Sequence, residues 1–296
     1  MQISYIPSKY QVFKPRIFYS LILLHLLSFS GVYLLVNNDK WCTILIQVFL
    51  LTQISGFGIT AGAHRLWSHK SYKATPLLKI ILWIFCCLAN QGSIFHWVRD
   101  HRTHHKGSDT TSDPHNIKNG FIFAHMGWLW YTKHPDVLQK SSQLKFDDMK
   151  NDWVVWLDQK LYPLPHLVAC YVLPTMYGKW MFGSYKIGFL VFGVLRWILL
   201  SHITWSVNSF AHMFGDKPYS KFITSSQNFI VSLFAVGEGW HNYHHTYPYD
   251  YRAGELPWYI QINITTLILD CFGKLGLAYD FKIAPSTLSK RIYVYN

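Results

Sequence analysis

Residues 97–106 read Trp-Val-Arg-Asp-His-Arg-Thr-His-His-Lys and place three histidines within five positions. Two other segments are equally rich in histidine: His64–His69 (His-Arg-Leu-Trp-Ser-His) and His241–His245 (His-Asn-Tyr-His-His). Imidazole is a ligand for zinc, copper, iron and nickel, so three such clusters in one chain indicate a metal site. We therefore expect a fold that brings these three distant segments together.

The spacing within the clusters predicts how the rings are presented. His101, His104 and His105 stand at i, i+3 and i+4, which places them on one face of a helix, and residues 241–245 repeat that spacing. Each triplet can serve one metal or divide its imidazoles between two. His64 and His69 are five positions apart, ~140° around an ideal α-helix. They fit best if they serve different metals, or if the helix ends between them.

The number of clustered histidines favours two metals. A structural zinc takes four ligands, typically including cysteine, whereas the clusters here contain neither cysteine nor a carboxylate motif. Iron is favoured because the site faces an apolar compartment, and two irons can reduce O2 to a product that attacks an unactivated C–H bond. Isolated histidines are interpreted as ordinary hydrogen-bonded or surface residues. These are His25, His96, His115, His125, His134, His166 and His202.

The composition indicates a membrane protein with a substantial water-facing part. The chain of 296 residues is 50% hydrophobic and only 14% charged, against about 25% charged in soluble domains. The net charge of +12 is typical of positive-inside topology and contact with anionic lipid, or of an anionic substrate head group. No nucleic-acid motif accompanies it. The five cysteines predict packing residues in a reducing compartment.

Apolar runs predict an all-α integral membrane protein, built as a single domain over residues 1–296 with four transmembrane helices in two hairpins. Lys and Arg near the N-terminus favour the cytosol for both termini and for the histidine-rich parts. The expected spans are about 17–36, 43–63, 164–182 and 187–207, and the expected cytosolic parts are 64–163 and 208–296.

Two features lie at membrane depth in this arrangement. The run 77–89 is apolar enough to cross, but one crossing would separate His101 from His64. We therefore expect it to lie in the interface, or to dip in and return. Arg196 and His202 fall within the last span, and we expect them to face the interior of the bundle.

The histidine segments resemble the three histidine boxes of the membrane acyl-CoA desaturases, the stearoyl-CoA desaturase family. The resemblance runs from Gly58 to Asp280 and includes Asp-Pro-His-Asn at 113–116, Gly-Trp-Leu at 127–129 and Gly-Glu-Gly-Trp-His-Asn-Tyr-His-His at 237–245. Residues 94–100, Ile-Phe-His-Trp-Val-Arg-Asp, are similar to the insect branch, which includes enzymes that make pheromone precursors.

The resemblance implies nine histidine ligands for two ferrous ions. The ninth is His212, which lies outside the boxes and whose role the residues alone leave open; Asn208, one turn earlier, is implied to bind iron through water. The implied metal site is His64, His69, His101, His104, His105, Asn208, His212, His241, His244 and His245.

The resemblance also implies a bent apolar tunnel for an acyl chain and a polar site for coenzyme A. The bend is matched by Gln91, Trp97, Thr204 and Trp205, and the coenzyme A site by Arg99, Asp100 and Lys133. Without the family, the tryptophans could equally be interfacial and the charges solvated.

Four positions depart from the pattern of mammalian members. Gly92 replaces an Asn that contacts coenzyme A, and Thr132 replaces a common basic residue, so these contacts are expected to be absent or weaker. Thr52 and Gly56 replace Tyr and Ala near the closed end of the tunnel, which predicts a deeper or differently shaped end.

The expected activity is insertion of a mainly cis double bond into a fatty acyl-CoA in the endoplasmic reticulum membrane, for unsaturated fatty acid biosynthesis. O2 is the oxidant. No His-Pro-Gly-Gly haem signature occurs in the chain, so the two electrons are expected from a separate cytochrome b5 with its reductase. The alternatives are a di-iron fatty acyl hydroxylase, whose product is an alcohol, and a membrane metal-binding or transport protein.

Overall fold

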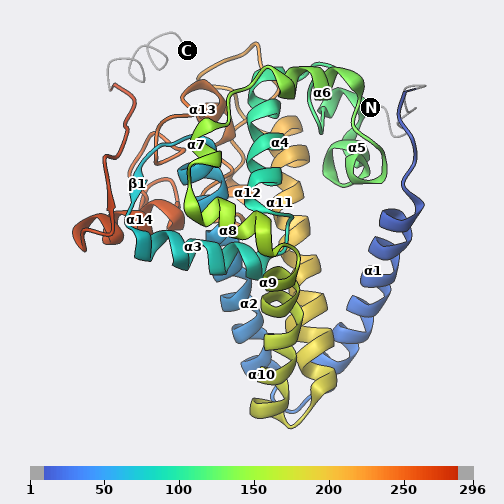
Figure 1. Ribbon diagram of the computed structural model, residues 1–296. Coiled ribbons are helices and arrows are strands. Elements are labelled where there is room, and N and C mark those ends of the chain that lie inside the picture. The colour runs from blue at the N-terminus through green and yellow to red at the C-terminus, as the bar shows by residue number, and fades with distance from the viewer. Residues whose placement is uncertain (1–9, 286–296) are drawn as a thin grey trace.

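Long apolar helices form the lower half of the molecule in Figure 1. The computed structural model describes residues 10–285. Three helical segments are long and apolar enough to cross a membrane: Pro15–Val36, Trp41–Ser68 and Ile187–Met213. The first is α1. The second consists of α2 (Trp41–Phe57) and the π-helix η1 (Gly58–Ser68), and the third of η5 (Ile187–Leu195) and α11 (Arg196–Met213). They match three of the four predicted spans.

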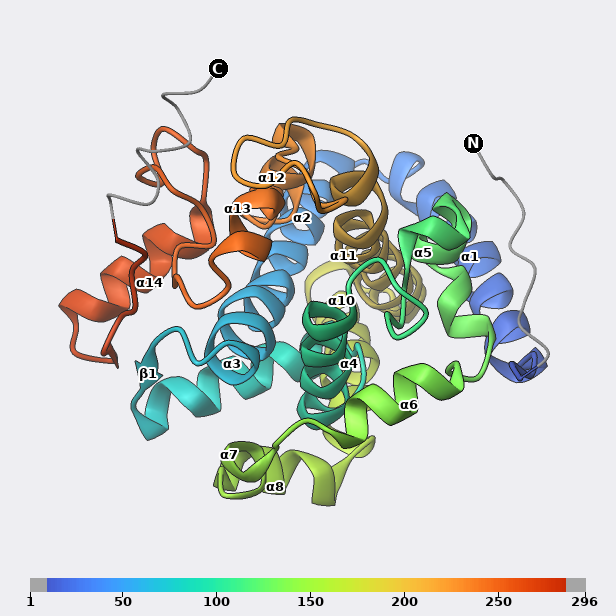
Figure 2. The same cartoon turned by 90° about the horizontal axis from the view of Figure 1, so that it is seen from above.

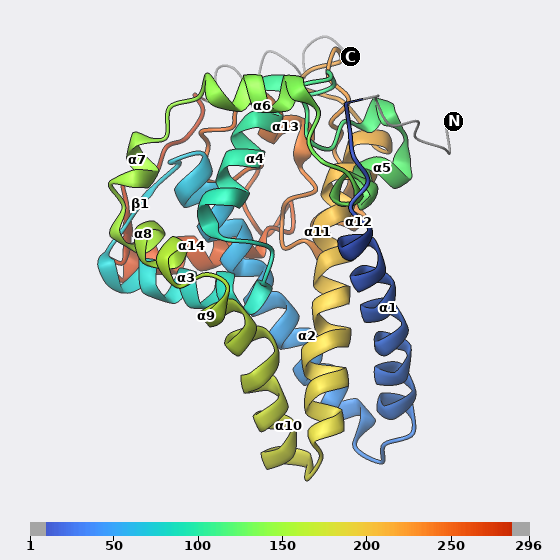
Figure 3. The same ribbon diagram turned by 45° about the vertical axis from the view of Figure 1, so that its right-hand side comes forward.

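The fourth predicted span, 164–182, is helical throughout as α9 (Leu164–Leu167), η4 (Val168–Val172) and α10 (Leu173–Phe182). Figures 1 and 3 show α10 running to the same end of the bundle as the turn between α1 and α2. It packs closely on η5, because a Cβ at Gly178 would lie 2.2 Å from the Cα of Gly188. The segment is not among the three helices that satisfy the length and hydropathy of a span, so its crossing stays a prediction.

The apolar run 77–89 does not continue straight. It forms α3 (Pro76–Ala89), and α4 (Ile94–Gly107) follows at an angle of 84°. Ser93 caps α4 by accepting a hydrogen bond from the backbone N–H of His96 at 3.3 Å. This bend lets α4 carry the second histidine cluster back to the first, which confirms that the run does not separate the two clusters.

Arg196 connects the helices around this bend. Its side chain is fully buried, as predicted, and its guanidinium donates to the carbonyls of Leu88 at 2.7 Å, Cys170 at 3.0 Å and Phe192 at 3.2 Å. Trp197 donates to the carbonyl of Asn90 at 3.2 Å. These donors satisfy carbonyls at the end of α3, which would otherwise be exposed to an apolar environment.

Short helices form a cap around α4, seen from above in Figure 2. A two-stranded antiparallel sheet pairs β1 (Lys73–Ala74) with β2 (Ala278–Tyr279) and so joins the two ends of the cap. A buried apolar cluster that includes Leu78, Val98 and Leu269 packs the cap onto α3 and α4. The cap helices are η2 (Ile117–Asn119), α5 (Phe121–His125), η3 (Gly127–Trp130), α6 (Pro135–Ser142), α7 (Asp147–Lys150), α8 (Trp153–Leu161), α12 (Phe229–Phe234), α13 (His241–Thr246) and α14 (Ile264–Lys274).

Three of the five cysteines agree with the prediction of packing residues, whereas Cys42 and Cys271 are exposed. All five are free thiols, and three of them, Cys86, Cys87 and Cys170, are buried. The predicted location of the two chain termini concerns residues outside the described range 10–285.

Candidate metal centre and substrate tunnel

The π-helix η1 determines how the first cluster is presented. A π-helix pairs residue i with residue i+5, and here the N–H of His69 donates to the carbonyl of His64 at 3.1 Å. Residues five apart therefore share a face, and the two rings lie 4.9 Å apart. The predicted alternative of different metals does not fit this closeness, because it assumed the rotation of an α-helix. The other predicted alternative, a helix that ends between the two histidines, agrees with η1, which ends at Ser68.

Nine imidazoles converge in two groups, within each of which the ligand nitrogens lie within 4.8 Å of one another. Both triplets divide between the groups, one of the arrangements that their spacing allows. We call them the five-histidine group and the four-histidine group. The five-histidine group contains His64, His69, His101, His105 and His244, and the four-histidine group contains His104, His212, His241 and His245.

The distances between ring nitrogens fit shared metal ions. In the five-histidine group, Nε2 of His244 lies 3.0 Å from Nε2 of both His64 and His105. In the four-histidine group, Nε2 of His245 lies 3.2 Å from that of His104 and 3.1 Å from that of His241. Two nitrogens each ~2.1 Å from one ion and at a right angle lie ~3.0 Å apart. The nitrogens are thus positioned as ligands around a common point.

Burial keeps these rings in the form that binds metal. It lowers the pKa of His101, His105, His244 and His245 well below 6.5, and positive charge on neighbouring histidines would lower each pKa further. Neutral imidazole is the metal-binding form. The two groups therefore need not lose protons near neutral pH before a metal binds.

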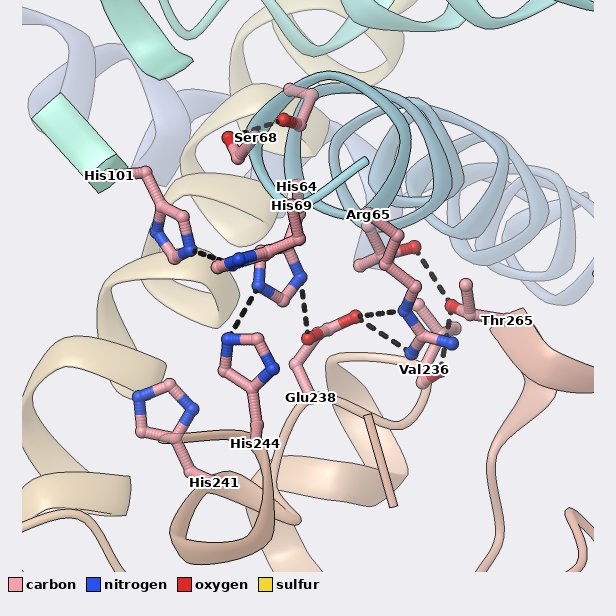
Figure 4. Close-up of polar contacts among 12 residues, drawn as sticks. His64, Arg65, Ser68, His69, His101, Val236, Glu238, His241, His244 and Thr265 are labelled. Atoms are coloured by element: carbon pink, nitrogen blue, oxygen red, sulfur yellow. Dashed lines mark hydrogen bonds and ion pairs between the residues drawn. The ribbon is translucent and has the colours of Figure 1, made fainter. Parts of the chain in front are cut away.

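A buried ion pair orients the five-histidine group (Figure 4). Nδ1 of His64 lies 2.9 Å from Oε2 of Glu238, while the guanidinium of Arg65 donates to Oε1 at 2.9 and 3.1 Å. Burial alone would raise the pKa of Glu238, but the contacts with His64 and with the guanidinium of Arg65 outweigh it and hold this pKa at about 2. The carboxylate thus fixes the proton of His64 on Nδ1 and leaves Nε2 for a metal.

The four-histidine group has two separate supports. Nδ1 of His104 lies 2.8 Å from Oδ1 of the buried Asp113. Nδ1 of His212 donates to the hydroxyl of Thr224 at 2.8 Å, and that hydroxyl in turn contacts the carboxylate of Asp109. Both contacts place the ring proton on Nδ1 and direct Nε2 into the group.

A cavity of about 840 Å³ leads from the cap towards the metal centre, and all seven predicted substrate residues line it. Charged residues gather at one part of it, where the carboxylate of Asp100 contacts both Arg99, at 3.1 Å, and Lys133. The departures Gly92 and Thr132 line this cavity as well. The seven predicted residues are Gln91, Trp97, Arg99, Asp100, Lys133, Thr204 and Trp205.

The inner part of the cavity borders the histidines. Gln91 donates to the hydroxyl of Thr204 at 2.8 Å, and the ring of Trp97 stacks on that of His101 at 4.9 Å. A smaller cavity of about 60 Å³ shares Trp97 and Thr204 with the larger one and is also lined by Thr52 and Gly56. This second cavity reaches side chains of both histidine groups, including His64 and His104.

A profile of the fatty acid desaturase family matches residues 39–282, which is most of the chain. The chain belongs to the fatty acid desaturase family. It is 43% identical over 271 residues to the acyl-CoA Delta-9 desaturase of Acheta domesticus, covering 91% of this chain and 75% of that protein. It is 45% identical over 272 residues to the stearoyl-CoA desaturase of Homo sapiens, with 91% and 75% covered.

The stearoyl-CoA desaturase of Sus scrofa is 43% identical over 286 residues, 94% of this chain and 79% of that protein. The sequence identities to the insect relative and to the mammalian relatives are nearly equal. They therefore do not test the prediction that the chain belongs to the insect branch. The histidine groups that could bind metal and the helical membrane architecture both agree with membership of this family.

The supporting residues of this family member escaped the sequence analysis. Glu238 and Asp113 stood within the motifs that carried the resemblance, but neither was assigned a role. The signal that could have found them is a carboxylate within a few positions of clustered histidines, because metal-binding histidines usually donate to such a group. Asn208 lies on α11 one turn before His212 and borders both cavities; its coordination of a metal stays a prediction.

Proposed function

We propose that this protein is an acyl-CoA desaturase that introduces a mainly cis double bond into a fatty acyl-CoA. The observation that carries the proposal is a pair of adjacent cavities that share lining residues, one of them lined by a cluster of charged residues and the other by side chains of both histidine groups. The names of the relatives supply the reaction class, because those proteins are acyl-CoA and stearoyl-CoA desaturases. The pathway would be unsaturated fatty acid biosynthesis.

Iron is the metal proposed for both groups. The donors are neutral imidazoles without thiolates, a set that suits iron among other transition metals, and Asn208 is proposed to complete the four-histidine group through water. When bound, the iron pair supplies O2 reduction and hydrogen abstraction, which no side chain can perform. The proposed ligands are the nine histidines of the two groups.

The chain's own residues would bind and place the substrate. Arg99 and Lys133 are proposed to pair with phosphates of coenzyme A, because charge-assisted contacts to phosphate are strong. Asp100 contacts both and would hold them in position. Along the acyl chain, Trp97 and Trp205 form rigid walls that exclude water. A rigid bend decides which carbons face the metals and favours a cis product.

The end of the tunnel is proposed to set the length of chain that is accepted. Thr52 and Gly56 line the inner cavity, and a Cβ on Gly56 would meet Leu200 at 3.4 Å. Replacing Gly56 by Leu and Thr52 by Tyr should fill this end and shift preference towards shorter acyl chains. Unchanged chain-length preference and unchanged double-bond position in the products would remove this part of the proposal.

The partners and the location are proposed from charge and reaction balance. Desaturation with O2 needs two electrons from outside, and a separate cytochrome b5 with its reductase is the proposed donor. The net charge of +12 supports a cytosolic, lipid-facing orientation of the cap and both termini in the endoplasmic reticulum membrane. A metal transporter is disfavoured, because the histidine groups lie at the ends of candidate spans, as His64 and His212 show.

The proposal is tested by expression in a yeast that lacks its own desaturase. Cells are fed defined saturated fatty acids, and the double bonds in their lipids are located by mass spectrometry. We expect a new alkene, mainly cis, at one principal position. A hydroxylated product would identify the hydroxylase alternative, and the absence of any new product from accumulated protein would overturn the proposal.

A further inference from the structure

Three histidines outside the metal centre are bonded in series. Nε2 of His25 on α1 lies 3.0 Å from Nε2 of His202 on α11, and Nδ1 of His202 lies 2.9 Å from Nε2 of His125 on α5. Nδ1 of His125 lies 2.8 Å from the hydroxyl of Ser209. We call His25, His202 and His125 the histidine chain. It connects α1 and α5, at the right of Figure 1, with α11, which runs through the middle of the picture.

A single carbonyl fixes the direction of every bond in the neutral histidine chain. Nδ1 of His25 lies 2.6 Å from the carbonyl oxygen of Leu21, which can only accept, so that nitrogen carries the proton. Nε2 of His25 must then accept from His202. Nδ1 of His202 accepts in turn from His125. Nδ1 of His125 then accepts from Ser209, whose single hydroxyl proton is directed to this nitrogen at 2.8 Å rather than to the carbonyl of Trp205 at 3.1 Å. All three rings are satisfied without a charge.

The arrangement does not suit a metal or a route for protons. The three rings bond one after another, and they are not among the groups of described residues whose nitrogens converge. A proton passed inwards would stop at the carbonyl of Leu21, which has no proton to pass on. Burial and the positive charge that His202 would carry lower the pKa of His125 to about 4. The histidine chain is therefore a neutral, directional structure.

The histidine chain lies directly behind one wall of the substrate cavity. The rings of His202 and His125 meet the indole of Trp205 edge to face, with centroids 5.2 and 5.9 Å apart and interplanar angles of 79° and 76°. Trp205 is 7% exposed and lines the larger cavity. Edge-to-face contacts favour one orientation of an aromatic ring, so the bonded histidines restrict how the indole can tilt.

We propose that the histidine chain positions Trp205 and thereby fixes where the acyl chain bends relative to the metal pair. His202 is the central positioning residue, because it bonds both other histidines and contacts the indole itself. This inference rests on the proposed desaturase function. Its consequence is selectivity: a loosened wall lets neighbouring carbons reach the metal centre.

The test compares His202→Leu with His202→Gln in the desaturase-deficient yeast. Leu removes both bonds, whereas Gln keeps one donor for His25 and one acceptor for His125. The readout is the ratio of double-bond positional isomers made from one saturated fatty acid. This ratio compares products of the same enzyme molecules, so it does not depend on how much protein folds. Leu199→Ala, at a half-exposed position on the same helix, is the matched control.

We expect His202→Leu to raise the share of minor isomers by ~10-fold, since a misplacement of ~1 Å can change a rate by ~100-fold. His202→Gln and Leu199→Ala should keep the wild-type ratio. An unchanged ratio in His202→Leu overturns the inference, as does a shift in His202→Gln as large as in His202→Leu. If the Leu variant does not accumulate, His25→Leu carries the same expectation. Wild-type protein that makes no alkene contradicts the proposed function instead.

Discussion

The five-histidine and four-histidine groups differ in the number of imidazoles and in the side chains that hold these imidazoles in place. The first contains five imidazoles. Its His64 contacts Glu238, which in turn pairs with the buried Arg65. The second has one imidazole fewer and is supported by Asp113 and Thr224. Catalytic metals keep an open position whereas structural ones are closed. With the proposed metals bound, this difference predicts that the more exchangeable position lies in the four-histidine group, beside Asn208.

The largest effect is expected from replacing one of the histidines of either group. His244→Ala and His104→Ala should each abolish every unsaturated product, because the His244 ring contacts His64 and His105, and the His104 ring contacts His245. Product analysis in the desaturase-deficient yeast measures this. Lys106→Ala, which changes an exposed residue on the same helix as His104, is the control and should retain activity. Surviving activity would remove the replaced histidine from the ligand set.

Replacing the carboxylates that contact the two histidine groups should have different effects on stability and on metal affinity. Glu238→Gln leaves the buried Arg65 without a countercharge, which costs ~3–5 kcal/mol in comparable pairs, and also releases His64. Asp113→Asn should lower metal affinity ~10–100-fold with a smaller loss of stability. Thermal unfolding in detergent and metal content, measured on both variants, separate the two effects.

The control for this pair is Asp280→Asn. It breaks an exposed ion pair with Lys73, and such pairs contribute ~0–1 kcal/mol. Equal stability of Glu238→Gln and Asp113→Asn would contradict the distinction between Glu238, which pairs with a buried arginine, and Asp113, whose ion-pair partners are histidines.

A smaller effect is expected at Asn208, since its contact with the metal is proposed to pass through water. Asn208→Ala should lower kcat ~10-fold, in the range seen for residues that act on a metal indirectly, and leave KM for the acyl-CoA nearly unchanged. Steady-state kinetics on purified protein with its electron donors measure this. An unchanged kcat would mean that the open position of the four-histidine group does not involve Asn208.

The last prediction concerns pH and the metal-free protein. The buried His244 and His245 resist protonation when folded, whereas the unfolded chain takes up protons below about pH 6.5. Stability should therefore be greatest above that pH and fall by up to ~1.4 kcal/mol per pH unit for each such ring as the pH decreases. The stabilising contribution of Glu238 is present above its ordinary pKa of 4.5 and is lost as the pH falls towards about 2. An unfolding temperature independent of pH between about 7.5 and 5 would contradict this.

Local spacing was enough to single out eight of the nine histidines that converge, but not their arrangement, and His212 was implied only by the family resemblance. The i, i+3, i+4 pattern correctly placed each triplet on one helical face, and the run 77–89 was correctly kept from separating the clusters. The π-helix that brings His64 and His69 onto one face was missed, because a π-helix is rare and α-helical rotation was assumed. The helix end between these two histidines was among the predicted alternatives. Contacts such as Arg65 with Glu238 join positions far apart in the chain, and no periodicity reports them.

The histidines outside the clusters show the same limit of sequence analysis. His25, His125 and His202 were interpreted as unrelated residues, since each is isolated in sequence and no pattern links them. Their bonds arise only when α1, α5 and α11 pack together. The apolar run 164–182 is helical as expected, but hydropathy alone does not qualify it as a span.

The central claim is that three histidine segments close around two metal ions. Protein purified in detergent from iron-supplied cells should be analysed for metal by inductively coupled plasma mass spectrometry, with the protein quantified by amino-acid analysis. The account predicts two iron atoms per chain, one for each histidine group. A single bound ion per chain in active protein would contradict it.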